Sequence, residues 1–242
     1  MENTVAFKSY MSSPHPSIKH STYFQVYEQL FQPYRNKKIT FVEIGILDGG
    51  SLFMWREFFG KEARIIGIDL NPEAKKWEQD NFEIHIGSQS DTQFWKQFVQ
   101  EIGPVDLVLD DGGHRFDQQI ITIESMLDHI NDGGMLVVED THTSYLEGFG
   151  DNHKSLMKYV KNYIDKINYR YSRLTRYATE HNVSDKVDLK VFSIEIFESI
   201  LAFKINRRLS HFPSYPTSNK DTLVQAVDYV HKEEFKDIDK FF

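Results

Sequence analysis

The stretch FVEIGILDGGSLFMW, residues 41–55, joins an apolar run to a helix-like pattern through three glycines. The apolar run predicts the end of a buried strand that carries Glu43, and the later pattern predicts an amphipathic helix that begins near Ser51. A glycine-rich turn between them lets a ligand approach the backbone and directs helix N–H groups towards it. The dinucleotide fingerprint G-x-G-x-x-G fails because Leu47 replaces its second glycine. Gly45 and Gly49 alone are equally compatible with a purely structural turn.

Outward from this turn, short apolar runs alternate with helical periodicity. Strands are predicted at Ile39–Ile44, Arg64–Ile68, Glu83–Ile86, Val105–Leu109 and Met135–Val138. A short helix is predicted from Tyr23 to Leu30. Two further helices are predicted from apolar residues at helical spacing, namely Ile120, Ile123, Leu127 and Ile130, and Leu156, Val160, Tyr163 and Ile167. Such alternation predicts an α/β fold whose parallel sheet is covered by helices on both faces. Near the C-terminus, Val191–Phe197 and Ile200–Ile205 predict an antiparallel pair of strands.

The chain of 242 residues is long enough for one large α/β domain, and we expect a single domain over residues 1–242. Residues 1–35 are predicted to form an N-terminal arm or lid, residues 36–206 the core and residues 207–242 a C-terminal extension. Within the extension, residues 211–221 are expected to form a loop, and the spacing of Leu223, Ala226, Val227 and Val230 predicts a last helix.

Composition excludes several classes of protein. Cysteine is absent, which excludes disulfides, zinc–thiolate sites and cysteine nucleophiles. The net charge of −8 argues against nucleic acid as the main partner. No stretch approaches the roughly 20 apolar residues that span a bilayer, and the N-terminus lacks a signal-peptide pattern. A cytoplasmic protein is therefore expected.

Polar residues at the ends of the second and third strands indicate a nucleoside site. Asp69 ends the second strand 24 residues after Gly45, where an acid commonly binds ribose hydroxyls in such folds. After the third strand, Ser88 and Gln89 lie where an adenine ring would be bound. The same segment is equally compatible with a helix cap, in which Ser90 or Asp91 begins a helix through Phe94 and Phe98.

Acidic residues also follow the fourth and fifth strands, in LDDGGH (109–114) and MLVVED (135–140). If these strands are neighbours, Asp111, Glu139 and Asp140 converge at the carboxyl edge of the sheet, about 5 Å apart. Carboxylates this close need a cation or raised pKa values, and oxygen ligands suit Mg²⁺, Mn²⁺ or Ca²⁺. Taken singly, each acid is as readily a helix cap or a solvated loop residue. His114, three residues after Asp111, is the expected general base, with His142 as the competing candidate.

These motifs together resemble a known family. The pattern E43-x-G45-x-x-x-G49-G50-S51, Asp69, G87-S-Q-S-D91, D110-D111-G-G-H114 and E139-D140-T-H-T-S-Y145 is similar to class I S-adenosylmethionine-dependent methyltransferases. More narrowly, it resembles the metal-dependent sugar O-methyltransferases of macrolide and polyketide biosynthesis, and the cephalosporin hydroxylase-like family shares the signature. The resemblance covers about residues 20–205. Gly113 stands where the family usually has serine, which alters the turn without removing a ligand.

The resemblance implies a Rossmann-like fold, a mostly parallel seven-stranded sheet with an antiparallel C-terminal strand. It implies S-adenosylmethionine and Mg²⁺ as cofactors and a sugar or glycoside as substrate, with His114 as the base. The residues expected to bind the cofactor are Glu43, Gly45, Gly49, Asp69, Ser88, Gln89 and Asp110, and those expected to bind the metal are Asp111, Glu139 and Asp140. Asp110 would otherwise cap the following helix or orient His114. The residues expected on the substrate side are Tyr145, His142, Tyr23 and Tyr27.

Three other readings stay open at this point. The hydroxylase-like relationship implies oxidation, although three carboxylates without two histidines suit non-haem iron poorly. A catechol-type O-methyltransferase also uses Mg²⁺ and vicinal hydroxyls, and a nucleoside-binding module would keep the fold without the chemistry. The acceptor stays open among a nucleotide sugar, a surface-polysaccharide residue and a natural-product glycoside, and self-association into a homo-oligomer is plausible.

Overall fold

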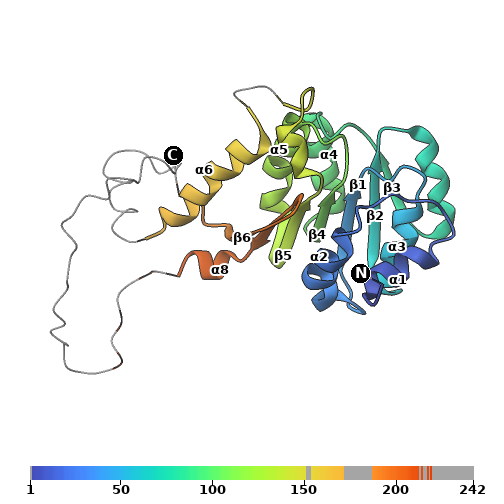
Figure 1. Cartoon of the computed structure of the whole chain (residues 1–242), viewed down its shortest axis with the longest axis horizontal. Coiled ribbons are helices and arrows are strands. Elements are labelled where there is room, and N and C mark those ends of the chain that lie inside the picture. Colours follow the sequence, from blue (N-terminus) through green and yellow to red (C-terminus); the bar gives the residue numbers. More distant parts are fainter. Residues whose placement is uncertain are drawn as a thin grey trace.

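The computed structural model describes residues 2–150, 154–171 and 187–212, together with residues 214, 217 and 219. One sheet of seven strands has the order β3-β2-β1-β4-β5-β7-β6 (Figure 1). The strands are β1 (Thr40–Ile44), β2 (Arg64–Asp69), β3 (Glu83–Ile86), β4 (Val105–Asp110), β5 (Ile130–Val138), β6 (Val191–Phe197) and β7 (Ile200–Ile205). Strands β1 to β5 are parallel, and β7 pairs antiparallel with both β5 and β6. The predicted mostly parallel sheet with an antiparallel C-terminal strand is confirmed.

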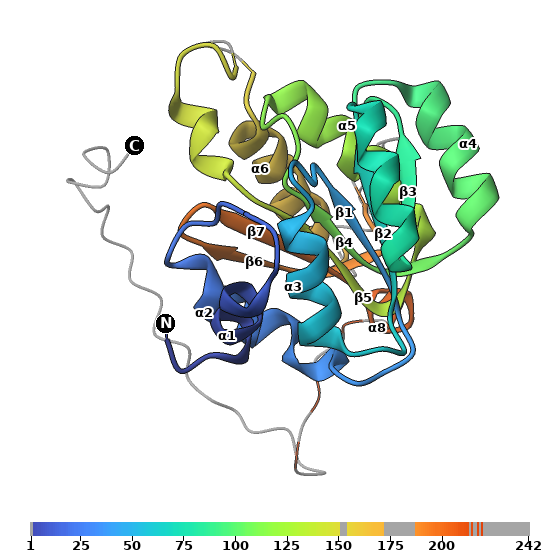
Figure 2. The same cartoon turned by 90° about the vertical axis from the view of Figure 1, so that its right-hand side faces the viewer.

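Helices cover both faces of the sheet, as Figures 1 and 2 show. One face packs against α1 (Val5–Ser12), α2 (Tyr23–Phe31), α3 (Gly50–Phe59) and the 3-10 helix η2 (Pro72–Asp80). The other face packs against α4 (Thr92–Ile102), α5 (Phe116–Met126) and α6 (Leu156–Asn168). Shorter helices are η1 (Gln32–Tyr34), η3 (Leu127–His129), η4 (Thr141–Tyr145) and α8 (Arg207–Ser210).

The apolar strands follow from this two-sided burial. Successive side chains of a strand point to opposite faces, so a strand covered on both faces needs apolar residues throughout. In β1, Phe41 packs with the helices of the first face, whereas Val42 and Ile44 pack with those of the second. Glu43 is the exception, since it is fully buried on the first face. A buried acid at the end of a central strand marks the edge at which the site lies.

Two sequence-based predictions need correction. Ile130 does not belong to the helix that contains Ile120 and Ile123, because α5 ends at Met126 and Ile130 begins β5 opposite Val105. Strand pairing there takes precedence over helical spacing. The N-terminal arm is also more than a polar extension. Val5–Ser12 forms α1, whose N-cap Thr4 accepts a hydrogen bond from the Phe7 backbone N–H at 3.1 Å. The predicted helix at residues 223–230 lies outside the described residues.

In the described part of the chain, no helix combines the length and the apolar character that crossing a membrane requires.

The β6–β7 hairpin packs against the core, and its contribution to the stability of the protein can be tested. Phe203 on β7 is fully buried against the second face, whereas Phe192 on β6 is 44% exposed. We expect Phe203→Ala to lower the free energy of unfolding by about 3–5 kcal/mol, because it removes apolar contacts and leaves a cavity. Phe192→Ala, the matched control, should change it by less than about 1 kcal/mol. Urea unfolding followed by circular dichroism measures both, and equal losses would contradict this packing.

Candidate functional site

The glycine turn after β1 lies against the turn after β4. Gly45 has a φ of +82°, and a Cβ added there would lie 2.2 Å from the backbone oxygen of Asp111. Only glycine allows the two backbones to approach so closely. Asp69, at the end of β2, holds the same turn, since its Oδ2 accepts hydrogen bonds from the backbone N–H groups of Ile46 and Leu47 at 3.0 and 3.2 Å.

A cavity of approximately 200 Å³ opens beside this turn. It lies at the carboxyl edge between β1 and β4, where the strand order reverses and ligands bind in open α/β sheets. It is lined by Ile44, Gly45, Leu47, Ile68, Asp69, Leu70, Gly87, Gln89, Gly112, Gly113 and Gln118. Of the predicted cofactor residues, Gly45, Asp69 and Gln89 therefore line one cavity.

The other predicted cofactor residues lie around that cavity rather than in its lining. Glu43 is buried beneath the turn, where it accepts hydrogen bonds from Ser51 Oγ at 2.7 Å and Trp55 Nε1 at 3.0 Å. Gly49 is the residue before α3 and lies against the Trp77 ring. The Ser88 hydroxyl accepts a hydrogen bond from the Ser90 backbone N–H at 3.2 Å.

Asp110 and Gln89 fix the loop after β4. Gln89 Nε2 donates to both carboxylate oxygens of Asp110, at 3.0 and 3.1 Å, and Gln89 Oε1 accepts from the Gly113 N–H at 2.7 Å. Burial raises the pKa of Asp110, although these hydrogen bonds oppose the shift. Asp110 is not the cap of α5, whose N-cap is Arg115. The alternative cap proposed after β3 is real, because Asp91 caps α4 by accepting from the Gln93 N–H at 2.8 Å.

Beyond this loop, Asp111, His114 and Asp140 form a cluster with metal-ligand spacing. One ligand atom from each lies within 4.8 Å of the others, and His114 Nε2 is 3.4 Å from Asp140 Oδ2. Both His114 and Asp140 have positive φ values, 59° and 54°, which side-chain-bearing residues adopt rarely and at a cost of about 1–3 kcal/mol each. The buried His114 Nδ1 has no hydrogen-bond partner in the described residues.

Glu139 turns inwards, away from the cluster that its neighbour Asp140 joins. Its carboxylate is buried and accepts a hydrogen bond from the Tyr27 hydroxyl at 2.5 Å. Burial and the nearby Asp111 raise the pKa of Glu139 well above its usual value. The predicted ligands Asp111, Glu139 and Asp140 thus meet at one edge, but in the structure Asp111 and Asp140 are grouped with His114.

The ammonium of Lys19 lies between the acids. Its Nζ is 2.5 Å from Asp111 Oδ2, 3.2 Å from Glu139 Oε2 and 3.6 Å from Glu43 Oε1. Burial would lower the pKa of Lys19, but the three carboxylates outweigh burial and raise it well above the usual value. Sequence reasoning missed this residue, because one lysine in a polar arm forms no pattern. One signal was the excess of acids at the sheet edge, which needs a cation or raised pKa values.

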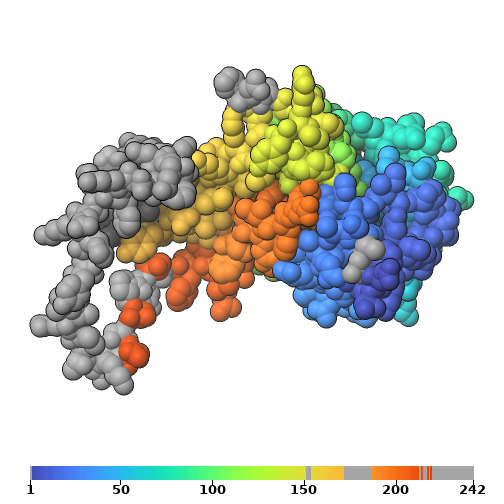
Figure 3. All heavy atoms as spheres, in the orientation of Figure 1, coloured from blue at the N-terminus to red at the C-terminus, as the bar shows by residue number. Residues whose placement is uncertain are grey.

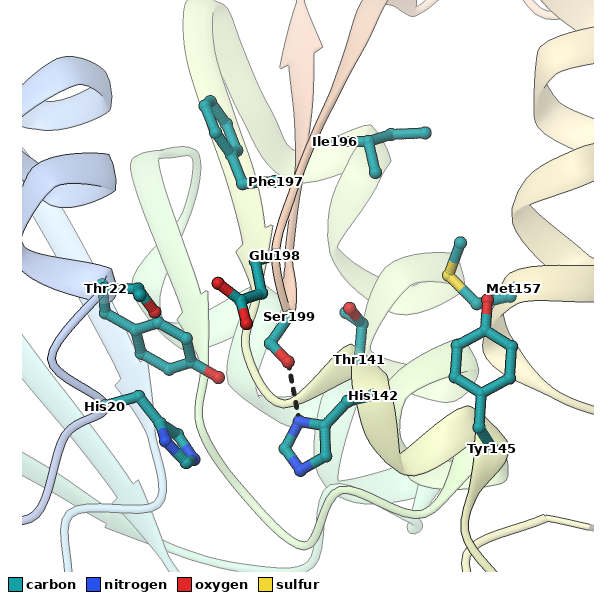
Figure 4. Close-up of a pocket in the computed structure, with 11 residues that line it drawn as sticks. His20, Thr22, Thr141, His142, Tyr145, Met157, Ile196, Phe197, Glu198 and Ser199 are labelled. Atoms are coloured by element: carbon teal, nitrogen blue, oxygen red, sulfur yellow. Dashed lines mark hydrogen bonds between the residues drawn. The ribbon is translucent and has the colours of Figure 1, made fainter.

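A second cavity, of approximately 500 Å³ and called the outer cavity below, is shown in Figure 4. The N-terminal arm, η4, the start of α6 and the β6–β7 hairpin enclose it, and the arm and the hairpin meet on the face shown in Figure 3. Its lining is His20, Thr22, Tyr23, Thr141, His142, Tyr145, Met157, Ile196, Phe197, Glu198 and Ser199. Three of the predicted substrate residues are among these, whereas Tyr27 is buried in the core beside Glu139.

The other carboxylate oxygen of Asp140 lies close to three residues of this lining. The Tyr23 hydroxyl donates to Asp140 Oδ1 at 2.5 Å, and His20 Nε2 and His142 Nδ1 lie 3.7 and 3.9 Å from that oxygen. Ser199 Oγ hydrogen-bonds His142 Nδ1 at 2.8 Å, as the dashed line in Figure 4 marks. His20, Asp140 and His142 therefore form a set of two histidines and one carboxylate, which the motifs at the strand ends do not indicate.

The chain is similar in sequence and in structure to known proteins. Residues 42–141 match a family model described as a methyltransferase domain. The matched residues run from β1 through the start of η4, so the matched segment includes both acidic strand ends and most of the lining of the cavity beside the glycine turn.

Curated proteins that are similar to this chain include sugar O-methyltransferases. The chain is 31% identical over 159 residues to 8-demethyl-8-alpha-L-rhamnosyl tetracenomycin-C 2'-O-methyltransferase of Streptomyces olivaceus, which covers 61% of this chain and 42% of the relative. It is 34% identical over 133 residues to mycinamicin VI 2''-O-methyltransferase of Micromonospora griseorubida, covering 51% and 32%. The chain spans less than half the length of these relatives.

Solved structures show the same fold. The MycE methyltransferase of the mycinamycin biosynthetic pathway, in complex with Mg and SAH, matches with a TM-score of 0.68 and 24% identity over 88% of this chain and 56% of that one. A crystal of MycE that also holds mycinamycin VI matches with a TM-score of 0.70 and 23% identity, covering 90% and 56%. The chain therefore has the Rossmann-like fold that the resemblance implied.

The glycine turn can be tested with a matched pair of substitutions. Gly49 has a φ of +77°, and a Cβ there would lie 2.3 Å from the Trp77 ring, whereas Gly133 has a φ of +88° with no atom within 4 Å. Gly133→Ala should cost about 1–2 kcal/mol of unfolding free energy from backbone conformation alone. Gly49→Ala should cost clearly more, because the turn or Trp77 must also move. Chemical denaturation measures both losses of unfolding free energy. Equal losses would show that the Trp77 ring moves aside without a measurable cost.

Proposed function

We propose that this chain is a methyltransferase that transfers a methyl group from S-adenosylmethionine to a hydroxyl of a sugar or glycoside, with a divalent ion at Asp111 and Asp140. The observation that supports it best is the position of the Asp111–His114–Asp140 cluster, directly beside the cavity at the β1–β4 switch point. Relatives named as sugar O-methyltransferases, and MycE crystals that hold Mg and SAH, support the choice of acceptor and cofactors.

The cluster fits a hard divalent ion. Two carboxylates lie within 4.8 Å of each other and of an imidazole whose Nδ1 is buried without a hydrogen-bond partner in the described residues. Oxygen ligands suit Mg²⁺, so we assign Asp111 and Asp140 as its ligands, with Glu139 as the third predicted acid. A bound divalent ion would act as a Lewis acid that lowers the pKa of an acceptor hydroxyl.

His114 is the proposed general base. Its Nε2 faces Asp140 Oδ2 at 3.4 Å, and the left-handed backbone at His114 directs the ring into the site. Nε2 takes the hydroxyl proton as the oxygen attacks the methyl carbon, and the carbon–sulfur bond breaks as the carbon–oxygen bond forms. The resulting imidazolium lies beside the Asp140 carboxylate, which stabilises its charge. Because the sulfonium is already an activated donor, alignment of the reacting atoms is the main task of the protein.

The outer cavity is the proposed acceptor site. It adjoins Asp140, and its lining combines aromatic rings with hydroxyl and imidazole groups, which suits a sugar ring. Tyr145, with 77% of its surface exposed, lies at its rim, and the Tyr23 hydroxyl is already bound to Asp140. We therefore assign Tyr23, His142 and Tyr145 to acceptor binding, and Tyr27 to the support of Glu139.

One observation favours a second candidate function. His20, Asp140 and His142 form the set of ligands that non-haem iron oxygenases use, next to the same acceptor cavity. Incubation with S-adenosylmethionine and a panel of nucleotide-linked and glycosidic sugars, read by mass spectrometry, separates the two candidates. A methyl transfer adds the mass of CH₂ and an oxygenation adds the mass of one oxygen atom.

Replacement of the base gives a direct test. We expect His114→Ala to lower kcat by about 10²–10⁴-fold with little change in cofactor affinity, because the ring acts on the acceptor proton. His129→Ala is the matched control, since His129 precedes β5 at the opposite edge of the sheet and should leave kcat unchanged. Steady-state kinetics and calorimetric binding of S-adenosylhomocysteine measure both effects. An unchanged kcat in His114→Ala would remove this residue as the base.

Metal removal tests the ligands. Activity should disappear in EDTA and return with excess Mg²⁺, because the acceptor hydroxyl then loses and regains its Lewis acid. Asp111→Asn should raise the Mg²⁺ concentration that restores half of the activity by about tenfold or more, since one anionic ligand is lost. Asp117→Asn, on the surface of α5, should not change it. Activity that EDTA does not change would exclude a metal-dependent reaction.

A further inference from the structure

The acids at the sheet edge already hold a cation supplied by the chain. Lys19 is buried, with 1% of its side chain exposed, and its Nζ lies within 3.6 Å of Asp111, Glu139 and Glu43. One ammonium faces three carboxylates, so the cluster keeps an excess of negative charge. A divalent ion would balance that charge more fully and would bind the oxygens directly.

The ammonium and such an ion would compete for the same oxygens. Magnesium–oxygen bonds are about 2.0–2.1 Å long. Asp111 Oδ2 and Glu139 Oε2 are 2.5 and 3.2 Å from Lys19 Nζ, so an ion bound to both would be a close neighbour of a like charge. With Lys19 in place, an ion bound to the set of Asp111, His114 and Asp140 would share Asp111 with the ammonium and would engage His114 as a ligand.

The segment that carries Lys19 is anchored on its N-terminal side by other contacts. Ser13 Oγ donates to the Gly50 backbone oxygen at 2.8 Å, and the His15 ring lies 4.5 Å from the Trp77 ring, centroid to centroid. After Lys19, the chain enters α2 at Tyr23. Residues 16–20 therefore bridge two fixed points, and Lys19 can withdraw while α1 and α2 keep their places. The Tyr10 hydroxyl donates a hydrogen bond to the Ser17 backbone oxygen at 2.8 Å, and this bond would have to break.

We propose that Lys19 and a divalent ion occupy the carboxylates of Asp111 and Glu139 alternately. This inference rests on the proposed metal-dependent function. When Lys19 is docked, Glu139 is withheld from the metal and residues 16–18 cover a cavity of approximately 80 Å³ that Gly45, Ser51 and Asp111 also line. When the ion enters, Lys19 leaves, Glu139 becomes a ligand and His114 is free to act as the base. Metal binding then also uncovers the turn beside the cofactor cavity.

Metal affinity of the whole chain tests this competition. Electron paramagnetic resonance titration with Mn²⁺ alone, without cofactor or acceptor, measures the dissociation constant of each variant. Lys19→Met should bind Mn²⁺ about tenfold more tightly than the natural chain, because a competing like charge is removed. Lys8→Met removes a positive charge from the exposed surface of the same arm and should leave the constant unchanged. Lys19→Met/Glu139→Gln should lose the gain, since the freed ligand is then neutral.

A measurement on the unaltered chain keeps the inference testable if Lys19→Met does not fold, which circular dichroism reveals. Hydrogen exchange at the backbone amides of residues 17–20 should become faster when Mg²⁺ is added, whereas exchange in α1 should not change. Equal or weaker Mn²⁺ binding by Lys19→Met, or unchanged exchange at residues 17–20, would show that the ion lies beside a docked Lys19. Either result overturns alternate occupancy but leaves metal-dependent transfer intact. Absence of Mn²⁺ binding in every variant would overturn both.

Discussion

The mutual repulsion of buried carboxylates at the carboxyl edge of the sheet is the constraint around which this domain is organised. Glu43 and Glu139 are almost fully buried, and Asp111 lies beside them. Carboxylates in such a place require a cation or a proton, and the structure uses Lys19 together with donors from Tyr27, Trp55 and Ser51. The N-terminal arm is therefore part of the core electrostatics, and α2 is fixed to the sheet by polar as well as apolar contacts.

The topology explains why these acids meet. The strand order reverses between β1 and β4, so the helices that follow the two strands, α3 and α5, lie on opposite faces and leave space at the edge of the sheet. Gly45 allows the backbone of Asp111 to come close, and the β5 end follows because the Glu139 N–H donates to the Asp110 oxygen at 2.9 Å. Residues separated by almost a hundred positions are thus brought together by strand pairing alone.

The strands and the residues at the sheet edge can be predicted from the sequence, because each strand is an apolar run that ends in polar residues. The directions in which the side chains point cannot be predicted in this way. Glu139 and Asp140 are adjacent, yet Glu139 points into the core, whereas the left-handed backbone of Asp140 turns that residue outwards. Lys19 and His20 were not predicted as site residues because their partners are distant in sequence. Ile130 fits helical spacing by coincidence, and only its pairing with Val105 decides its place.

Asp140 belongs to two neighbourhoods at once. One carboxylate oxygen faces His114, and the other faces Tyr23, His20 and His142 at the mouth of the outer cavity. A rigid carboxylate cannot rotate to suit one neighbourhood without disturbing the other. Substitutions that reshape the proposed acceptor cavity are therefore expected to displace the proposed base as well, so that acceptor selectivity and reaction rate change together. Evolution of new acceptor preferences in this scaffold should favour positions in the β6–β7 hairpin, which line the cavity without touching that carboxylate.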